Sequence, residues 1–268
     1  MPSKYLIISD LDATLLDHYT YSWEAATEAL GHLKNLKIPL ILCSSKTASE
    51  MKVYWNELKL DSPFISENGA AVSFPFLENG IYKFRQELFS DSYENIVRIA
   101  NELREKHNFL FKGFSDLNAE AISELTGLSL EASILASQRD CSEPISWYGN
   151  EESLKLFEEL LRDRGLSLTK GGRFYHIKGS FSKGTTLKWL IEKLSLESKS
   201  KDILTVALGD GRNDKEMLEL VDYSIVIKSH NGTYLALDKE ELVFKSKYEG
   251  PKGWNEEIIR FLKSYSLL

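Results

Sequence analysis

The stretch LIISDLDATLLD, residues 6–17, joins an apolar run to a pair of acids. The segment Tyr5–Ser9 has the continuous apolar character of a strand that is buried on both faces of a sheet. Asp10 and Asp12 follow it at once with one residue between them, and Thr14 comes next but one. Such a strand would deliver two carboxylates and a hydroxyl to one edge of a sheet. This stretch is therefore the first candidate for a functional site.

The segments around this stretch alternate between strand and helix patterns. Further strands are expected at 38–43, 63–66, 70–74, 203–208 and 223–227, and helices at 23–36, 46–58 and 213–220. Fully apolar strands that alternate with helices favour a parallel sheet covered on both faces. We therefore expect an α/β fold with a Rossmann-like parallel sheet as its core.

The middle of the chain has a different pattern. Residues 82–88 alternate between polar and apolar, as in a half-exposed strand. Helices are then expected near 92–106, 117–125, 130–137 and 151–164, and strands near 144–148, 166–169 and 173–178. This mixture indicates an α+β domain inserted into the first one. The expected division is a core of residues 1–80 and 180–268 and an inserted domain of residues 81–179.

Composition limits the possible functions. The 268 residues carry a net charge of -7, which argues against nucleic acid as a partner because no basic surplus meets the phosphates. Neither a signal peptide nor an apolar run of about 20 residues is evident, so no membrane association is expected. The two cysteines, Cys43 and Cys141, are too few for a disulfide framework and are expected to be reduced thiols in a cytoplasmic protein. The oligomeric state is left open.

Four chemical features fall where expected strands end or helices begin. They are the pair Asp10 and Asp12, Ser44 with Ser45, Lys183, and the pair Asp210 and Asp214 in GDGRND. Ligands of open parallel sheets bind beyond the carboxyl ends of the strands. Taken singly, each feature has an ordinary structural explanation: a solvated turn, a helix N-cap for Ser44, or a surface lysine. Their joint placement favours a functional site.

These groups suit chemistry on a phosphate. A carboxylate is a usable nucleophile towards phosphorus, and a second carboxylate nearby can serve as acid and then as base. Carboxylates alone would repel a phosphate dianion, so a cation is required, and Mg2+ prefers such oxygen ligands. Asp210 would add a further carboxylate, while Lys183 and the Ser44 hydroxyl would bind phosphoryl oxygens.

The ordered motifs resemble the haloacid dehalogenase-like phosphatase superfamily. DLDAT at 10–14 matches DxDx[TV], Ser44 ends an apolar strand, Lys183 precedes a helix, and GDGRND at 209–214 matches GDxxND. The insertion resembles the α+β cap of the Cof-like branch. Longer motifs resemble the mannosyl-3-phosphoglycerate phosphatase family, which releases mannosylglycerate and phosphate. They are DHYTYSWEAA at 17–26, CSSKT at 43–47, PFISENGAAV at 63–72, QRDCSEP at 138–144 and GGRFYHIKG at 171–179.

The resemblance implies a role for each matching residue. Asp10 would be the nucleophile and a Mg2+ ligand, and Asp12 the general acid and base, with its carbonyl also on the metal. Asp210 and Asp214 would complete the metal site. Lys183 would hold Asp10 and the phosphate, and Thr14, Ser44 and Asn213 would contact the phosphate or orient the site. One departure is Ala13, where the family commonly has glycine; only a small change in the turn is expected from it.

The cap is expected to select the substrate, a small phosphorylated sugar-glycerate. A guanidinium suits its carboxylate, so Arg139 and Arg173 are candidates, with Gly171 and Gly172 allowing close approach of the backbone. Glu143 would bind sugar hydroxyls, and His176 is a further candidate. A surface ion pair and a structural histidine are the ordinary alternatives. The turn at Asn68 and Gly69 is expected to face the cap.

Other substrates and other protein classes share part of this set of motifs. Glucosyl-3-phosphoglycerate and sucrose 6-phosphate are alternative substrates, because the catalytic motifs do not distinguish them. A phosphomutase would have to keep water from its phosphoryl enzyme. A phospho-accepting signalling domain also combines an aspartate, a hydroxyl residue and a lysine, but it lacks an acid at the position of Asp12 and a large insertion. The segment DGRND at 210–214 does not fit a calcium-binding loop, because the glycine and the final glutamate of such a loop are misplaced.

Overall fold

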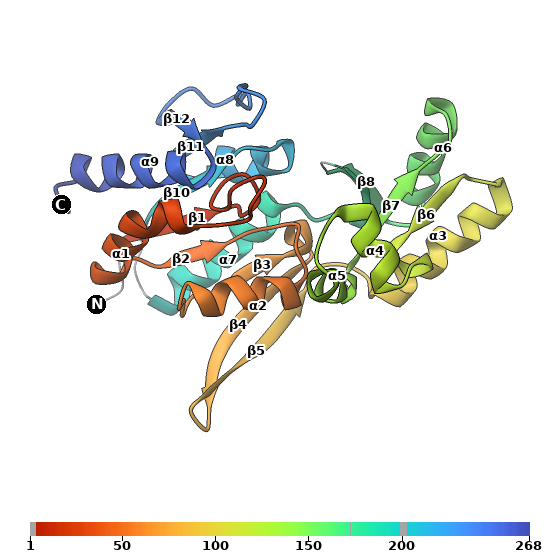
Figure 1. Cartoon of the computed structure of the whole chain (residues 1–268), viewed down its shortest axis with the longest axis horizontal. Coiled ribbons are helices and arrows are strands. Elements are labelled where there is room, and N and C mark those ends of the chain that lie inside the picture. Colours follow the sequence, from red (N-terminus) through yellow and green to blue (C-terminus); the bar gives the residue numbers. More distant parts are fainter. Residues whose placement is uncertain (1–3, 172, 199–202) are drawn as a thin grey trace.

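A five-stranded parallel sheet forms the centre of the core in the computed structural model, which describes residues 4–171, 173–198 and 203–268 (Figure 1). Its order is β12 (Val243–Glu249), β11 (Tyr223–Lys228), β10 (Leu204–Gly209), β1 (Tyr5–Ser9) and β2 (Leu40–Leu42). At the carboxyl end of β1, Ser9 lies opposite Leu208 of β10 and Leu42 of β2. The predicted parallel core is confirmed, and the ends of three strands meet beside Asp10.

Helices cover both faces of this sheet. The 3-10 turn Glu24–Ala26, α1 (Thr27–Asn35), α2 (Ala48–Glu57) and α9 (Gly250–Ser264) pack on one face. The helices α7 (Lys183–Ser198) and α8 (Lys215–Leu220), the latter preceded by the 3-10 turn Arg212–Asp214, pack on the other. In β1, Ile7 belongs to the first apolar cluster and Ile8 to the second. Burial on both sides, worth about 1.5–3 kcal/mol for each isoleucine, explains why this strand is apolar throughout.

A small antiparallel sheet lies beside the core. It consists of β3 (Phe64–Ser66), β4 (Ala71–Glu78) and β5 (Ile81–Leu88), and its long β4–β5 hairpin projects from the molecule (Figure 1). The 3-10 turn Glu67–Gly69 joins β3 to β4. The boundary predicted near Gly80 falls in the turn of the hairpin, and β5 pairs with β4 along its whole length. The division of the chain into numbered domains stays a prediction.

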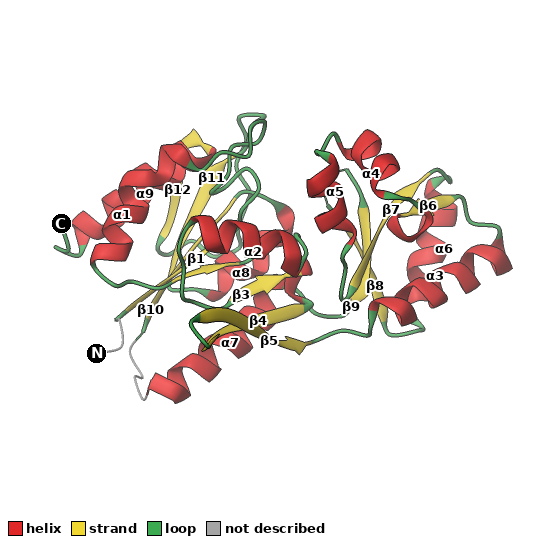
Figure 2. Cartoon of the chain, turned by 60° about the horizontal axis from the view of Figure 1, so that its bottom comes forward, coloured by secondary structure: helices red, strands yellow, loops and turns green. Residues whose placement is uncertain are grey.

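The cap has its own sheet and its own apolar core. Its strands, in the order β6 (Phe111–Gly113), β7 (Ser142–Trp147), β9 (Tyr175–Gly179) and β8 (Leu166–Lys170), are antiparallel. The helices α3 (Tyr93–His107) and α6 (Glu151–Arg162) bury apolar side chains against this sheet. The 3-10 turn Phe114–Asp116, α4 (Ala119–Thr126) and α5 (Leu130–Ser137) complete it, with α5 on the side that faces the core (Figure 2). The predicted α+β insertion is confirmed.

Both cysteines, Cys43 and Cys141, are buried and free. Within the ranges that the structure describes, every helix is too short or too polar to cross a bilayer.

Candidate active site

Lys183 lies between two buried aspartates at the carboxyl ends of the central strands. It is the first residue of α7, and its Nζ donates to Oδ1 of Asp10 at 2.6 Å and to Oδ1 of Asp214 at 2.7 Å. Only 1% of Lys183 is exposed. Burial by itself lowers the pKa of this amine, but the charges of Asp10 and Asp214 outweigh burial and raise the pKa above its ordinary value. The lysine is therefore a permanent positive charge inside the site.

Three carboxylates surround this amine. Asp10, Asp210 and Asp214 each have a carboxylate oxygen within 4.8 Å of the others. Burial, and then the charge of Asp214, raise the pKa of Asp10 well above its usual range and that of Asp210 to about 7. Asp214 is fixed by the backbone N–H groups of Asp210 and Gly211, at 3.1 and 2.9 Å from its Oδ2. One lysine does not balance three acids, so the cluster fits a divalent cation with oxygen ligands.

Thr14 and Asn213 lie at this cluster. The hydroxyl of Thr14 donates to Oδ1 of Asp210 at 3.3 Å, and the side-chain amide of Asn213 donates to Oδ1 of Asn68 at 3.1 Å. Ala13 has φ of 59°, in the left-handed region. A Cβ costs about 1–2 kcal/mol in that conformation, and glycine would avoid this cost. Alanine at this position therefore strains the turn between Asp12 and Thr14, which is more than the small change expected from the sequence.

Ser44 follows the strand β2 and is held mainly by its backbone. Its N–H donates to the carbonyl of Ile65 at 3.0 Å, and its carbonyl accepts from the N–H of Asn68 at 2.9 Å. The N-cap of α2 is Thr47, which forms a capping box with Glu50. The alternative of Ser44 as a helix N-cap is therefore wrong. Among the described residues, its hydroxyl has one long hydrogen bond, which it accepts from the N–H of Lys46 at 3.3 Å.

Asp12 is held apart from the other acids by a residue that sequence reasoning missed. Its Oδ1 lies 2.9 Å from Nζ of Lys46, a buried lysine that also lies 3.9 Å from Oε1 of Glu50. Burial alone would lower the pKa of Lys46, but the charges of Asp12 and Glu50 raise it. The sequence signal was weak, because Lys46 in CSSKT looks like any lysine at the start of a helix. The carboxylate of Asp12 thus faces a cation from the neighbouring loop.

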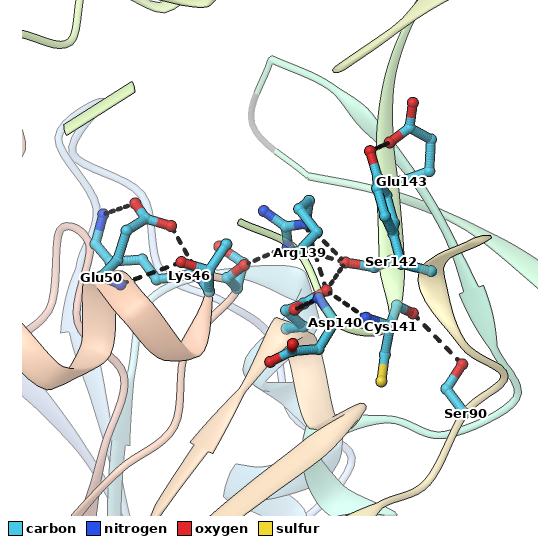
Figure 3. Close-up of polar contacts among 12 residues, drawn as sticks. Lys46, Glu50, Ser90, Arg139, Asp140, Cys141, Ser142 and Glu143 are labelled. Carbon is cyan, nitrogen blue, oxygen red and sulfur yellow. Dashed lines mark hydrogen bonds and ion pairs between the residues drawn. The ribbon is translucent and has the colours of Figure 1, made fainter. Parts of the chain in front are cut away.

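Arg139 and Glu143, predicted to bind substrate, are both engaged within the protein (Figure 3). Arg139 donates from Nε and Nη2 to the hydroxyl of Ser142 and from Nη2 to the carbonyl of Ser45, and its Nε lies 3.4 Å from Oε2 of Glu67. Glu143 accepts from the N–H and hydroxyl of Ser115 and from the hydroxyl of Tyr93, at 2.9, 2.6 and 2.8 Å. Burial raises the pKa of Glu143. Neither side chain contacts the acidic cluster.

The other predicted cap residues differ in their surroundings. Arg173 is exposed and donates from Nη1 to the carbonyl of Thr126 at 2.6 Å, while Gly172 lies outside the described residues. His176 has a buried Nδ1 that finds no hydrogen-bond partner among the residues that the structure describes. Burial, and then the charges of Arg139 and Lys178, lower the pKa of His176 to about 3. Of the two that the structure describes, Arg173 has the side chain that is open to solvent.

Comparison with known proteins agrees with this geometry. A family model described as haloacid dehalogenase-like hydrolase matches residues 7–250. A glucosyl-3-phosphoglycerate/mannosyl-3-phosphoglycerate phosphatase of Methanococcoides burtonii is 38% identical over 96% of both chains. One of the same name from Persephonella marina is 37% identical over 96% of this chain and 97% of its own.

Solved structures show the same fold. A protein of Thermoplasma acidophilum superposes with a TM-score of 0.68 at 17% identity, covering 98% of this chain and 99% of its own. A phosphatase of the haloacid dehalogenase superfamily from Bacteroides thetaiotaomicron gives 0.66 at 18% identity, with coverages of 100% and 97%. The family match and the two curated relatives confirm the predicted enzyme class, a phosphoric monoester hydrolase. The chain belongs to the haloacid dehalogenase-like hydrolases.

Proposed function

We propose that the chain is a Mg2+-dependent phosphatase that hydrolyses 2-(α-mannosyl)-3-phosphoglycerate to mannosylglycerate and phosphate. The observation that carries the proposal is the buried set of Asp10, Asp214 and Lys183, joined at 2.6 and 2.7 Å, with Asp210 beside it. The substrate is supported by two relatives of 37–38% identity, whose names include both the glucosyl and the mannosyl compounds. The glucosyl compound is therefore the second candidate, ahead of sucrose 6-phosphate.

In the first step, a carboxylate oxygen of Asp10 attacks phosphorus. A bond forms between this oxygen and phosphorus, and the bond from phosphorus to the glycerate oxygen breaks. Asp12 gives a proton to the leaving oxygen. Lys183 holds the Asp10 carboxylate in place and balances its charge, while Lys46 orients Asp12. In the second step, Asp12 takes a proton from water, whose oxygen displaces Asp10 from phosphorus.

Asp10, Asp210 and Asp214, together with the carbonyl of Asp12, would hold the metal. A bound Mg2+ supplies positive charge that offsets the repulsion between these carboxylates and the phosphoryl oxygens. The hydroxyl of Ser44 and the amide of Asn213 would donate to the phosphate, and the hydroxyl of Thr14 would do so after releasing Asp210. For the glycerate carboxylate we propose Arg173, with the backbone near Gly172. Direct contacts from Arg139 or Glu143 would first require release of their present partners.

A panel of phosphate-release assays with Mg2+ tests the proposal. The substrates are mannosyl-3-phosphoglycerate, glucosyl-3-phosphoglycerate, sucrose 6-phosphate and simple hexose phosphates, and Asp10→Asn is the control. We expect a higher kcat/KM for the mannosyl compound than for the others and no release by the control. Equal values for both glycerates would mean that the cap selects the phosphate and the carboxylate. A long-lived aspartyl-phosphate without turnover would favour the signalling alternative. A cytoplasmic location stays a prediction.

A further inference from the structure

The Glu67–Gly69 turn lies between the cap and the catalytic cluster and has unusual backbone angles. Its three residues have φ of 49°, 58° and 99°, so all three adopt the left-handed region. Glu67 is completely buried and Asn68 is 5% exposed. Left-handed angles at two successive residues other than glycine persist only where the surroundings hold them. The partners of this turn therefore decide what it does.

The side chain of Glu67 is bound by the segment Arg139–Ser142 of the cap, while its backbone N–H donates to the carbonyl of Lys46 in the core. Its Oε1 accepts from the N–H of Asp140 at 2.7 Å, and its Oε2 accepts from the N–H of Cys141 at 3.2 Å and from the hydroxyl of Ser142 at 2.6 Å. Arg139 supplies the opposite charge, with its Nε 3.4 Å from Oε2, and bonds the same Ser142 hydroxyl (Figure 3). A buried carboxylate is tolerated only with such partners, so Glu67 needs the cap segment in place.

The next two residues face the catalytic cluster. The N–H of Asn68 donates to the carbonyl of Ser44 at 2.9 Å, and its Oδ1 accepts from Asn213 at 3.1 Å. The carbonyl of Gly69 accepts from the hydroxyl of Thr186 in α7 at 2.6 Å. A Cβ on Gly69 would lie 2.3 Å from the carbonyl oxygen of Ser182, directly before Lys183. One short turn thus contacts three of the four loops that carry the site.

We propose that Glu67 is a positioning residue that couples the docking of the cap segment Arg139–Ser142 to the alignment of Ser44, Asn213 and Lys183. When the cap segment leaves, the Glu67 carboxylate loses its partners, and the left-handed turn keeps only its contacts with the core. Asn68 and Gly69 then move, because they directly follow Glu67 in the same short turn. The inference rests on the proposed phosphatase function, and it gives Arg139 a role in joining cap to core.

The test uses Glu67→Gln in the full chain, with Asp116→Asn as the matched control. Asp116→Asn removes a carboxylate charge as Glu67→Gln does. The carboxylate of Asp116 binds Arg104, which lies within the cap and away from the Glu67–Gly69 turn. Steady-state kinetics are measured with 4-nitrophenyl phosphate and with the best sugar phosphate of the wild type. We expect Glu67→Gln to lower kcat at least tenfold on both substrates, and Asp116→Asn to change it less than twofold. A residue that only shapes the cap would raise KM for the sugar phosphate and leave 4-nitrophenyl phosphate turnover unchanged, which would overturn the proposal.

Amide hydrogen exchange supplies a readout that needs no turnover. In Glu67→Gln we expect faster exchange at 140–142 in the cap and also at 68–70 and around Ser44 in the core. Faster exchange confined to the cap segment would contradict the coupling. The milder Ser142→Ala, which removes one hydrogen bond to Glu67, should give the same pattern and serves if Glu67→Gln does not fold. If the wild type hydrolyses none of the substrates, the proposed function fails, and the exchange data still decide the coupling.

Discussion

The charge balance of the site depends on Lys183, whose amine binds Asp10 and Asp214 at once. Its replacement in Lys183→Met would leave two buried carboxylates without a cation. Removing one partner of a buried ion pair destabilises by about 3–5 kcal/mol. Loss of one preorganised charge at a reacting group lowers kcat by roughly 10²–10³. We therefore expect both a lower free energy of unfolding in urea and a large loss of phosphate release.

The control for this variant is Lys188→Met on the same helix. Lys188 is exposed, so its substitution should change the free energy of unfolding by less than about 0.5 kcal/mol. Equal effects of the two variants, or a Lys183→Met protein as stable as the wild type, would show that Lys183 is not the cation on which the acids depend.

His176 predicts a pH dependence of stability. Burial lowers its folded pKa to about 3, whereas an unfolded histidine titrates near 6.5, so the unfolded chain binds more protons between these values. The contribution of neutral His176 to the free energy of unfolding is therefore complete above about pH 6.5. It is lost as the pH falls towards 3, at up to about 1.4 kcal/mol per pH unit. His176→Phe should flatten this loss in urea titrations between pH 6.5 and 4.5. Parallel curves for both proteins would contradict the prediction.

At the scale of elements, the position of Lys183 depends on how closely α7 approaches α8. A Cβ on Gly184 would lie 2.6 Å from Cβ of Glu216 and 2.8 Å from its carbonyl carbon. Gly184→Ala should therefore push the two helices apart, at a cost of about 1–3 kcal/mol, and lower kcat by displacing Lys183. The matched control is Gly31→Ala in α1, where nothing lies within 4 Å. Alanine there should stabilise by up to about 1 kcal/mol, and thermal unfolding of both variants checks the pair.

The elements that the sequence predicts best are those buried on two faces. Their apolar runs predicted the bounds of β1, β2, β10 and β11 to within a few residues. The strands β6 and β12 and the helix α9 were not predicted. The edge strand β12 is mostly polar and half-exposed, and β6 has only three residues. Burial on one face gives short or polar strands too little apolar signal to be recognised.

The same reasoning applies to the site. Asp10, Asp210 and Lys183 were predictable as a group, since parallel strands end at one edge of the sheet. The ion pairs of Lys46 with Asp12 and of Arg139 with Glu67 were not predictable, because each joins segments that are far apart in the chain. A guanidinium that serves a buried glutamate looks in sequence like one that is free for a substrate carboxylate.

At the scale of the whole molecule, the acidic cluster joins the two ends of the core. Asp10 follows the first strand, whereas Asp210 and Asp214 follow β10, beyond the whole cap. A ligand bound by all three residues therefore requires both parts of the core to be folded together. Any ion that binds the native cluster and not the unfolded chain stabilises the entire core through mass action.

Mg2+ should accordingly raise the unfolding temperature of the protein. At 100 times its dissociation constant, the gain is about 2.7 kcal/mol. Because the pKa of Asp210 is raised to about 7, the ion must displace a proton at lower pH, so the gain should be smaller at pH 6 than at pH 8. Asp210→Asn removes one ligand and should abolish most of the shift. Calorimetry with and without Mg2+ measures it, and an equal shift in wild type and variant would show that the ion stabilises the chain from another place.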